Sequence, residues 1–180
     1  AKRDATDSEN GGFNINGTMF ANITPLKGLT ITSRLGYRLS YSTSHSYTSP
    51  YFLGDRGSVH TYSISAGANT SWYYQWENFA NYTRNFGKHN ITAMLGQECW
   101  ESRWENSSIF NSKLPSDEVH NPALGTGKPT ISHGFGSAAM SSFFTRETYK
   151  YDNRYHLTYT HRHDGSSNFG HENRWVGLHS

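Results

Sequence analysis

The chain has 180 residues, of which 34% are hydrophobic and 15% aromatic, and it carries a formal net charge of +2. No apolar run approaches the roughly 20 residues of a membrane-spanning helix, which excludes helical spans. The 16 Lys and Arg residues are scattered, so nothing points to nucleic acid, and the lone Cys99 allows no disulfide within the chain. A transmembrane β-strand needs only about 9 to 11 residues, with alternate side chains facing lipid, so the composition leaves a membrane β-barrel open.

The first quarter of the chain alternates apolar and polar residues with a period of two, which predicts two β-strands. The first strand is expected at Phe13–Ile23, with apolar residues at odd positions. A turn at Pro25–Gly28 leads into a second strand, Leu29–Ser42, whose polar face carries Arg34 and Arg38. This alternation is longer than the roughly 5 to 6 residues of a typical soluble strand, which favours a barrel wall over a sandwich.

The middle of the chain predicts a loop, a weak strand and a hairpin. Ser44–Gly57 is rich in Ser, Tyr, Pro and Gly, which is typical of a loop, and a weaker strand is expected at Val59–Ala66. Trp72–Thr83 alternates clearly again. A turn at Phe86–His89 then reverses the chain into Ile91–Cys99, so these two long strands are expected to form a β-hairpin.

The last part of the chain predicts a long loop and a second hairpin. Periodicity disappears over Asn106–Gly136, where prolines and glycines interrupt the chain, and an extended surface loop is expected. Strand signals resume at Ala139–Tyr151 and return, after a turn at Asp152–Arg154, over Tyr155–Arg162. No stretch has helical periodicity. The sequence therefore predicts an all-β fold of about eight long antiparallel strands with long loops, a pattern that favours a transmembrane β-barrel.

One motif follows the last predicted strand. It reads Asp-Gly-Ser-Ser-x-Phe-Gly, with Asn-Arg-Trp shortly after, and its residues are Asp164, Gly165, Ser166, Ser167, Phe169, Gly170, Asn173, Arg174 and Trp175. With the stretches 23–30, 82–96 and 151–158, in this order and spacing, the motif resembles the barrel region of SusC/RagA-type TonB-linked (TonB-dependent) outer-membrane proteins. The chain departs from that family at His161 and His163, which flank Arg162, and at Val176, where the family usually has Gly.

The resemblance implies a protein of the bacterial outer membrane that imports oligosaccharides or peptides with energy delivered through TonB. Its implied partners are a SusD-like surface lipoprotein, the TonB complex and outer-membrane lipid, with no cofactor and no enzymatic activity. The resemblance further implies that residues 1–180 are an internal part of a large antiparallel transmembrane β-barrel with long extracellular loops, without the plug domain and the remaining strands. Residues 1–10 contain no apolar segment, so any export signal is expected upstream. Two alternatives remain open: a soluble carbohydrate-binding β-sandwich and a small self-contained outer-membrane barrel.

Few residues suggest chemistry. Trp100 and Trp104, near the predicted long loop, are candidates for binding substrate, because flat apolar rings pack well on carbohydrate faces. The motif beginning at Asp164 is expected to be structural, since Gly relieves backbone strain and Asp and Ser side chains bond nearby amides. His161 and His163 share one face of a strand while Asp164 points away, so no metal site is expected.

Overall fold

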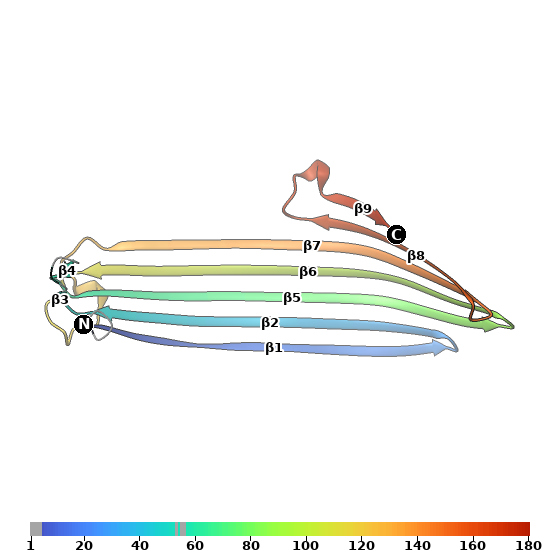
Figure 1. Ribbon diagram of the computed structural model, residues 1–180, viewed down its shortest axis with the longest axis horizontal. Coiled ribbons are helices and arrows are strands. Elements are labelled where there is room, and N and C mark those ends of the chain that lie inside the picture. Colours follow the sequence, from blue (N-terminus) through green and yellow to red (C-terminus); the bar gives the residue numbers. More distant parts are fainter. Residues whose placement is uncertain (1–4, 53, 55–56) are drawn as a thin grey trace. The chain divides into compact units, whose positions relative to one another are not determined.

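The computed structural model describes residues 5–52, 54 and 57–180, which form a seven-stranded sheet and a separate two-stranded one (Figure 1). In sheet order the seven strands are β1 (Thr6–Leu26), β2 (Leu29–Thr48), β5 (Ser63–Phe86), β6 (His89–Ser112), β7 (Thr130–Tyr151), β8 (Tyr155–Ser166) and β9 (Trp175–His179). The short sheet pairs β3 (Tyr51–Phe52) with β4 (Ser58–Val59), and single 3-10 turns form at Pro122–Leu124 and His171–Asn173. No helix among the described residues is long and apolar enough to cross a membrane. The prediction of an all-β fold built from long antiparallel strands is confirmed.

Several strand boundaries predicted from the sequence are wrong. The loop expected at Asn106–Gly136 is strand at both ends, since β6 continues to Ser112 and β7 begins at Thr130. In the same way β2 runs on to Thr48, inside the expected loop that starts at Ser44. These segments are rich in Ser, Asn and Gly, which give no apolar alternation. A neighbouring strand nevertheless satisfies the backbone N–H and C=O groups whatever the side chain is, so the strands continue.

The weak strand expected at Val59–Ala66 does not exist as one element. Val59 belongs to the short strand β4, whereas the residues from Ser63 onward belong to β5. Strand β5 then continues without a break through the predicted strand Trp72–Thr83, to a total of 24 residues. The sequence therefore predicts the strong half of this strand correctly and misses that the two halves are continuous.

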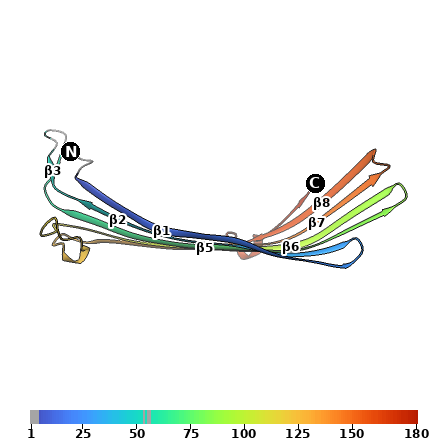
Figure 2. The same ribbon diagram turned by 90° about the horizontal axis from the view of Figure 1, so that it is seen from below.

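The chain divides into two compact units, each made of three segments. Unit 1 contains Ala1–Ile15, Leu39–Ser71 and Trp104–Gly136, and unit 2 contains Asn16–Arg38, Trp72–Arg103 and Ser137–Ser180. The short turns that join β1 to β2, β5 to β6 and β7 to β8 all lie in unit 2 and gather at its end (Figure 2). Left-handed backbone at Gly28 and Gly87 makes two of these turns, and Asp152 and Asn153 adopt it in the third.

Unit 1 contains a small hydrophobic core where the segment 113–129 leaves the sheet. Tyr47, Ile64 and Leu114 are buried there, and Tyr62 and Val119 pack against them. The same segment is tied down by Asn111, only 3% exposed, whose amide donates to the carbonyl oxygens of Pro122 and Gly125 at 2.8 and 3.1 Å. The connection between β6 and β7 is therefore a packed loop.

Unit 2 has a different distribution of apolar side chains. Among the described side chains of unit 2, that of Ser142 is fully buried and polar, while large apolar residues such as Leu95 (64% exposed) and Ile23 (62%) lie open to the surroundings. Among the described residues no second layer covers the sheet, as it would in a β-sandwich, where inward-facing residues of two sheets bury each other. An apolar surface left open in this way needs an apolar environment to cover it.

Candidate functional site

One face of unit 2 carries a continuous network of polar side chains. Successive side chains of a strand point to opposite faces, so alternate positions of each strand share this surface. Strands β2, β5, β6, β7 and β8 contribute to the network, which consists of Arg34, Tyr73, Gln75, Glu77, Glu98, Ser142, Arg162 and Asp164. We call the surface that carries these residues the polar face.

Arg162 on β8 is the centre of this network. Its Nε donates to Asp164 Oδ1 at 2.7 Å, on the same strand, and its second terminal nitrogen donates to Glu98 Oε2 on β6 at 3.1 Å. That nitrogen also lies 3.1 Å from the hydroxyl oxygen of Ser142 on β7, a side chain with no exposed surface. The guanidinium further lies over the ring of Phe144, 6.0 Å from its centroid. One side chain therefore ties three neighbouring strands together with charge-assisted hydrogen bonds.

Gln75 on β5 extends the network toward β2. Its Nε2 donates to Glu98 Oε1 at 2.7 Å and to Glu77 Oε1 at 2.8 Å, while its Oε1 accepts from the Tyr73 hydroxyl at 2.8 Å. Glu77 in turn accepts from Arg34 on β2 at 3.2 Å. Each of the two glutamates thus has a guanidinium partner, and the amide of Gln75 links the two ion pairs.

The opposite surface of unit 2 is predominantly apolar, and we call it the apolar face. Ile31 on β2, Ala80 on β5, Leu95 on β6 and Phe143 on β7 line a shallow hollow of about 350 Å³ on it. Trp76 lies on the same face and donates from its indole nitrogen to the hydroxyl of Ser33 at 3.0 Å. Apolar residues on one face and polar residues on the other are the pattern expected of a strand between lipid and an aqueous channel.

The family motif forms the junction between β8 and β9. Gly165 pairs with Trp175, and a Cβ on Gly165 would lie 2.7 Å from the indole ring, so only glycine leaves room for it. The ring also stacks on Phe143, with 6.2 Å between centroids, and lies 5.1 Å from the imidazole of His163. The spacing between Gly165 and Trp175 is therefore explained by this close packing.

Hydrogen bonds around the two serines hold the junction in place. The Ser166 amide donates to the Arg174 carbonyl at 3.0 Å, and the Ser166 hydroxyl accepts from the Asn168 amide at 3.2 Å. Ser167 bonds Ala139 twice, because its amide donates to the Ala139 carbonyl at 2.9 Å and its hydroxyl accepts from the Ala139 amide at 2.8 Å. The hydroxyl groups of both serines thus form hydrogen bonds with backbone amides of the chain.

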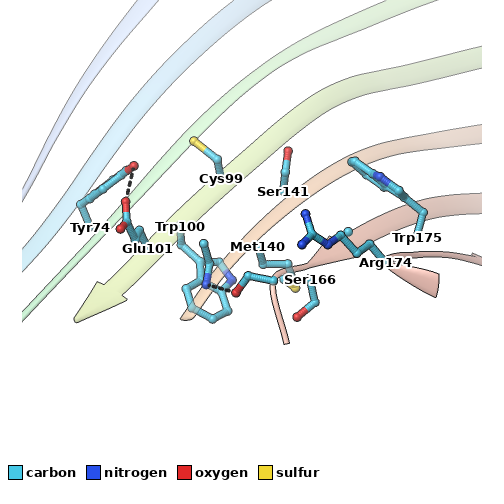
Figure 3. A pocket seen from close by; sticks show the side chains of 12 residues that line it. Tyr74, Cys99, Trp100, Glu101, Met140, Ser141, Ser166, Arg174 and Trp175 are labelled. Atoms are coloured by element: carbon cyan, nitrogen blue, oxygen red, sulfur yellow. Dashed lines mark hydrogen bonds between the residues drawn. The ribbon is translucent and has the colours of Figure 1, made fainter. Parts of the chain in front are cut away.

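The rest of the motif closes the turn that follows. Arg174 donates from Nε to the Phe169 carbonyl at 3.3 Å, and the Asn173 amide donates to the Gly170 carbonyl at 3.0 Å. The ring of Phe169 itself is 57% exposed. A cavity of about 350 Å³ lies beside the junction, and Arg174 and Trp175 line it together with residues of β5, β6 and β7 (Figure 3). The structural role expected for the motif stays a prediction, and these contacts are what it would act through.

Trp100 and Trp104 lie within β6, not beside a loop as the sequence suggested, because the strand extends to Ser112. Trp100, in unit 2, lines the cavity of Figure 3 and lies against Tyr73 with 6.0 Å between ring centroids. Trp104, in unit 1, is 47% exposed, and a Cβ on Gly136 would lie 2.7 Å from its indole nitrogen. A role for either tryptophan in binding substrate stays a prediction.

The histidines of β8 and β9 pack on one another. His161 stacks on His179, with 4.5 Å between ring centroids and 2.9 Å between the Nδ1 atoms, and the Tyr159 hydroxyl lies 3.2 Å from the same His179 nitrogen. Asp164 bonds Arg162 instead, as its position on the other face of the strand predicts. Within the described part of the chain, no group of three or more His, Cys, Asp or Glu side chains has an arrangement that could hold a metal ion.

The partners that complete the polar network were not predicted from the sequence. Alternation placed Arg34 on a polar face, but nothing in the sequence connected Arg34 with Glu77 or Arg162 with Glu98. The available signal was the charge at alternate positions of long strands, which indicates a surface shielded from lipid. Which charges meet depends on strand register, which alternation alone does not give.

Comparison with known proteins finds that this chain is similar to TonB-dependent receptors. No protein-family model matches the chain. Two TonB-dependent receptors of Formosa agariphila are similar to it, one 31% identical over 102 residues (56% of the chain) and the other 27% identical over 152 residues (82%). The chain spans only 10% and 14% of the lengths of these relatives.

Solved structures give the same result over nearly the whole chain. The RagAB peptide transporter matches 98% of it with 26% identity and a TM-score of 0.86, and the RagAB peptide importer in the 'open-open' state matches 98% with 25% identity and a TM-score of 0.91. The chain covers 20% of each of those chains. The resemblance to RagA-type TonB-linked outer-membrane proteins is confirmed, and with it the predicted outer-membrane location.

Proposed function

We propose that this chain is a section of the barrel wall of a TonB-dependent importer of the outer membrane. The observation that carries the proposal is the match to the RagAB peptide importer, at a TM-score of 0.91 over 98% of the chain. Because the chain covers only 20% of that protein, the plug domain and the remaining strands of such an importer would lie in parts of the protein outside these residues. The section itself contributes wall and loops, and no catalytic step.

In this arrangement the polar face lines the channel and the apolar face contacts lipid. Barrel strands alternate apolar residues toward lipid with polar residues toward the lumen, which fits the network around Arg162 on one side and Leu95 and Phe143 on the other. The short turns of unit 2 would face the periplasm, since outer-membrane barrels have short periplasmic turns. An interior ion-pair network then stiffens the wall where lipid cannot reach it.

The imported molecule is a peptide or an oligosaccharide. The peptide is supported by the relatives named RagAB peptide transporter and importer, and the oligosaccharide by the resemblance to SusC-type proteins. The same resemblance supports a SusD-like surface lipoprotein as partner and the TonB complex as the source of energy.

The experiment that tests import measures uptake in the native bacterium. Cells with and without the gene, and cells lacking TonB, receive fluorescent peptides or fluorescent oligosaccharides of graded length. Uptake of one class that requires both the gene and TonB is the expected result and identifies the substrate. Equal uptake of both classes in all three strains would refute the import function.

A second experiment distinguishes the proposal of a barrel-wall section from the two alternatives, a soluble β-sandwich and a small closed barrel. The sheet order begins with β1 and ends with β9, so each has an unpaired edge in the isolated segment. Unpaired backbone groups cost several kcal/mol each in lipid and promote aggregation in water. The 180 residues expressed alone are therefore expected to aggregate. A monodisperse β-rich protein in plain buffer would favour the sandwich, and a compact monomer only in detergent would favour the small barrel.

A further inference from the structure

The polar face contains a pocket that the ion-pair network does not fill. Its volume is about 460 Å³, and it lies within unit 2 between β1, β2 and β5. The residues that line it are Asn16, Gly17, Thr18, Gly36, Tyr37, Arg38, Tyr73 and Gln75. Most of its lining side chains are polar, and the groups of the adjacent ion-pair network are already paired with one another. The pocket is therefore a candidate site for a polar ligand.

Strand register brings donor groups together in this pocket. The Thr32 hydroxyl donates to Asn22 Oδ1 at 2.8 Å across β1 and β2, and the Tyr37 ring packs over Gly17. In the antiparallel register that these contacts define, Asn16 lies opposite Arg38 and the neighbouring Thr18 lies opposite Gly36. An amide, a hydroxyl and a guanidinium therefore share one small region.

These donors have no partners within the described residues. Arg38 is exposed and makes neither an ion pair nor a hydrogen bond with any described side chain, and the same holds for the side chains of Asn16 and Thr18. In contrast, Arg34 is paired with Glu77, at 3.2 Å. The amide of Gln75 is fully engaged with other residues of the network, so it borders the pocket without offering a free donor.

The floor and the rim of the pocket are also suited to a ligand. Gly36 has no side chain to fill the floor, and a Cβ there would have its nearest neighbours at 3.9 Å, which is ordinary contact. At the rim, the ring of Tyr73 lies 6.0 Å from the ring of Trp100. The aromatic pair offers an apolar surface next to the cationic group, so a ligand with one charged group and one flat apolar face would fit both.

We propose that this pocket is a carboxylate-binding subsite for the molecule that the importer carries. A guanidinium binds a carboxylate through two parallel charge-assisted hydrogen bonds, and the Asn16 amide and Thr18 hydroxyl supply further donors. The carboxylate belongs to a uronic acid unit of an oligosaccharide or to the C-terminus of a peptide. This inference rests on the proposed import function and deepens it, since it assigns the substrate an acidic group.

Binding to the purified full-length receptor in detergent tests the subsite. Isothermal titration calorimetry compares trigalacturonic acid with galactotriose, and N-acetyl-trialanine with N-acetyl-trialanine amide, so that each carboxylate probe has a neutral counterpart. The unsubstituted receptor is expected to prefer at least one carboxylate probe. The variant Arg38→Gln is expected to bind that probe about tenfold or more weakly, the loss typical of a charge-assisted bond, and to bind the neutral counterpart unchanged.

Two further variants keep the result interpretable. Arg146→Gln makes the same chemical change at an exposed arginine of β7 that does not line the pocket, and it is expected to bind both probes normally. Gly36→Leu fills the floor while Arg38 stays in place, and it is expected to weaken carboxylate binding as well.

The outcomes separate this subsite from the import function. The subsite is refuted if the unsubstituted receptor does not prefer either carboxylate probe, or if Arg38→Gln leaves the preference intact. It is also refuted if Arg146→Gln weakens binding as much as Arg38→Gln, because the effect is then general electrostatics. Import itself is judged by gene- and TonB-dependent uptake, which can persist when the subsite is absent.

Discussion

Replacing Arg162 with Gln is expected to destabilise the folded receptor by about 2 to 4 kcal/mol. The substitution removes a guanidinium that donates to Asp164 at 2.7 Å, to Glu98 at 3.1 Å and to Ser142 at 3.1 Å. Removing one partner of a fully buried ion pair costs about 3 to 5 kcal/mol, because the other charge is left buried and unpaired. The Arg162 side chain is 35% exposed and that of Glu98 13%, so water compensates part of this penalty.

The assay is the rate of unfolding of the full-length receptor in guanidinium chloride, in detergent micelles, for a double-mutant cycle. If the network is already broken in the transition state for unfolding, a loss of about 2 kcal/mol in stability speeds unfolding roughly 30-fold. Glu98→Gln is expected to have a smaller effect, since Arg162 keeps its bond to Asp164. The double variant is expected to fall short of the sum of the two single effects by about 1 kcal/mol.

Additivity of the two single substitutions to within about 0.5 kcal/mol would refute the reasoning, because residues that do not interact behave additively. Arg146→Gln serves as the control for the loss of one positive charge. Arg146 is exposed, and it has no ion pair or hydrogen-bonded side chain among the described residues, so its loss is expected to change the unfolding free energy by less than about 0.5 kcal/mol.

Three further predictions concern other parts of the wall. Gly165→Val is expected to displace the Trp175 ring, which leaves no room for a Cβ, and to shift the tryptophan fluorescence of the folded receptor; an unchanged spectrum would contradict the packing. Leu95→Arg on the apolar face is expected to destabilise the barrel by about 2 to 4 kcal/mol in lipid bilayers, while Thr92→Arg on the polar face has little effect; equal losses would contradict the assignment of faces. Tyr47→Ala is expected to accelerate proteolysis of the loop 113–129, which limited trypsin digestion of intact cells measures.

Alternation predicted the strands well wherever one face is apolar. The expected strand start at Leu29 and the expected turn at Phe86–His89 coincide with the structure, because apolar residues at alternate positions mark a surface that must be covered. The prediction fails in unit 1, at the ends of β2, β6 and β7. There, both faces carry Ser, Asn and Gly, and the strands persist because adjacent strands pair with them. Pairing between distant segments leaves no local signal in the sequence.

The motif from Asp164 to Trp175 indicated the family, but it did not predict the strand that explains its spacing. The motif that contains Gly165 and Trp175 carried the resemblance to the family together with the stretches 23–30, 82–96 and 151–158. The reason for the spacing lies in β9, which pairs with β8 so that the indole covers the glycine. Neither alternation nor turn chemistry predicts β9, a strand of five residues that are all exposed. Its position depends on the contacts of Trp175 with Phe143 and His163, residues of other strands.

The two arginines on the polar face of β2 show why the role of a charged residue cannot be inferred from the sequence of its own strand. Arg34 and Arg38 occur at equivalent positions of the same alternation and are chemically identical. What distinguishes them is the charge of their neighbours on the adjoining strands: Arg34 meets Glu77 of β5 at 3.2 Å, whereas the residues of β1 and β5 that line the pocket beside Arg38, among them Asn16 and Tyr73, carry no charge. Register thus makes one guanidinium part of the wall and leaves the other available to a ligand. A substitution at Arg34 should therefore mainly reduce the stability of the folded receptor, and a substitution at Arg38 should mainly reduce ligand binding.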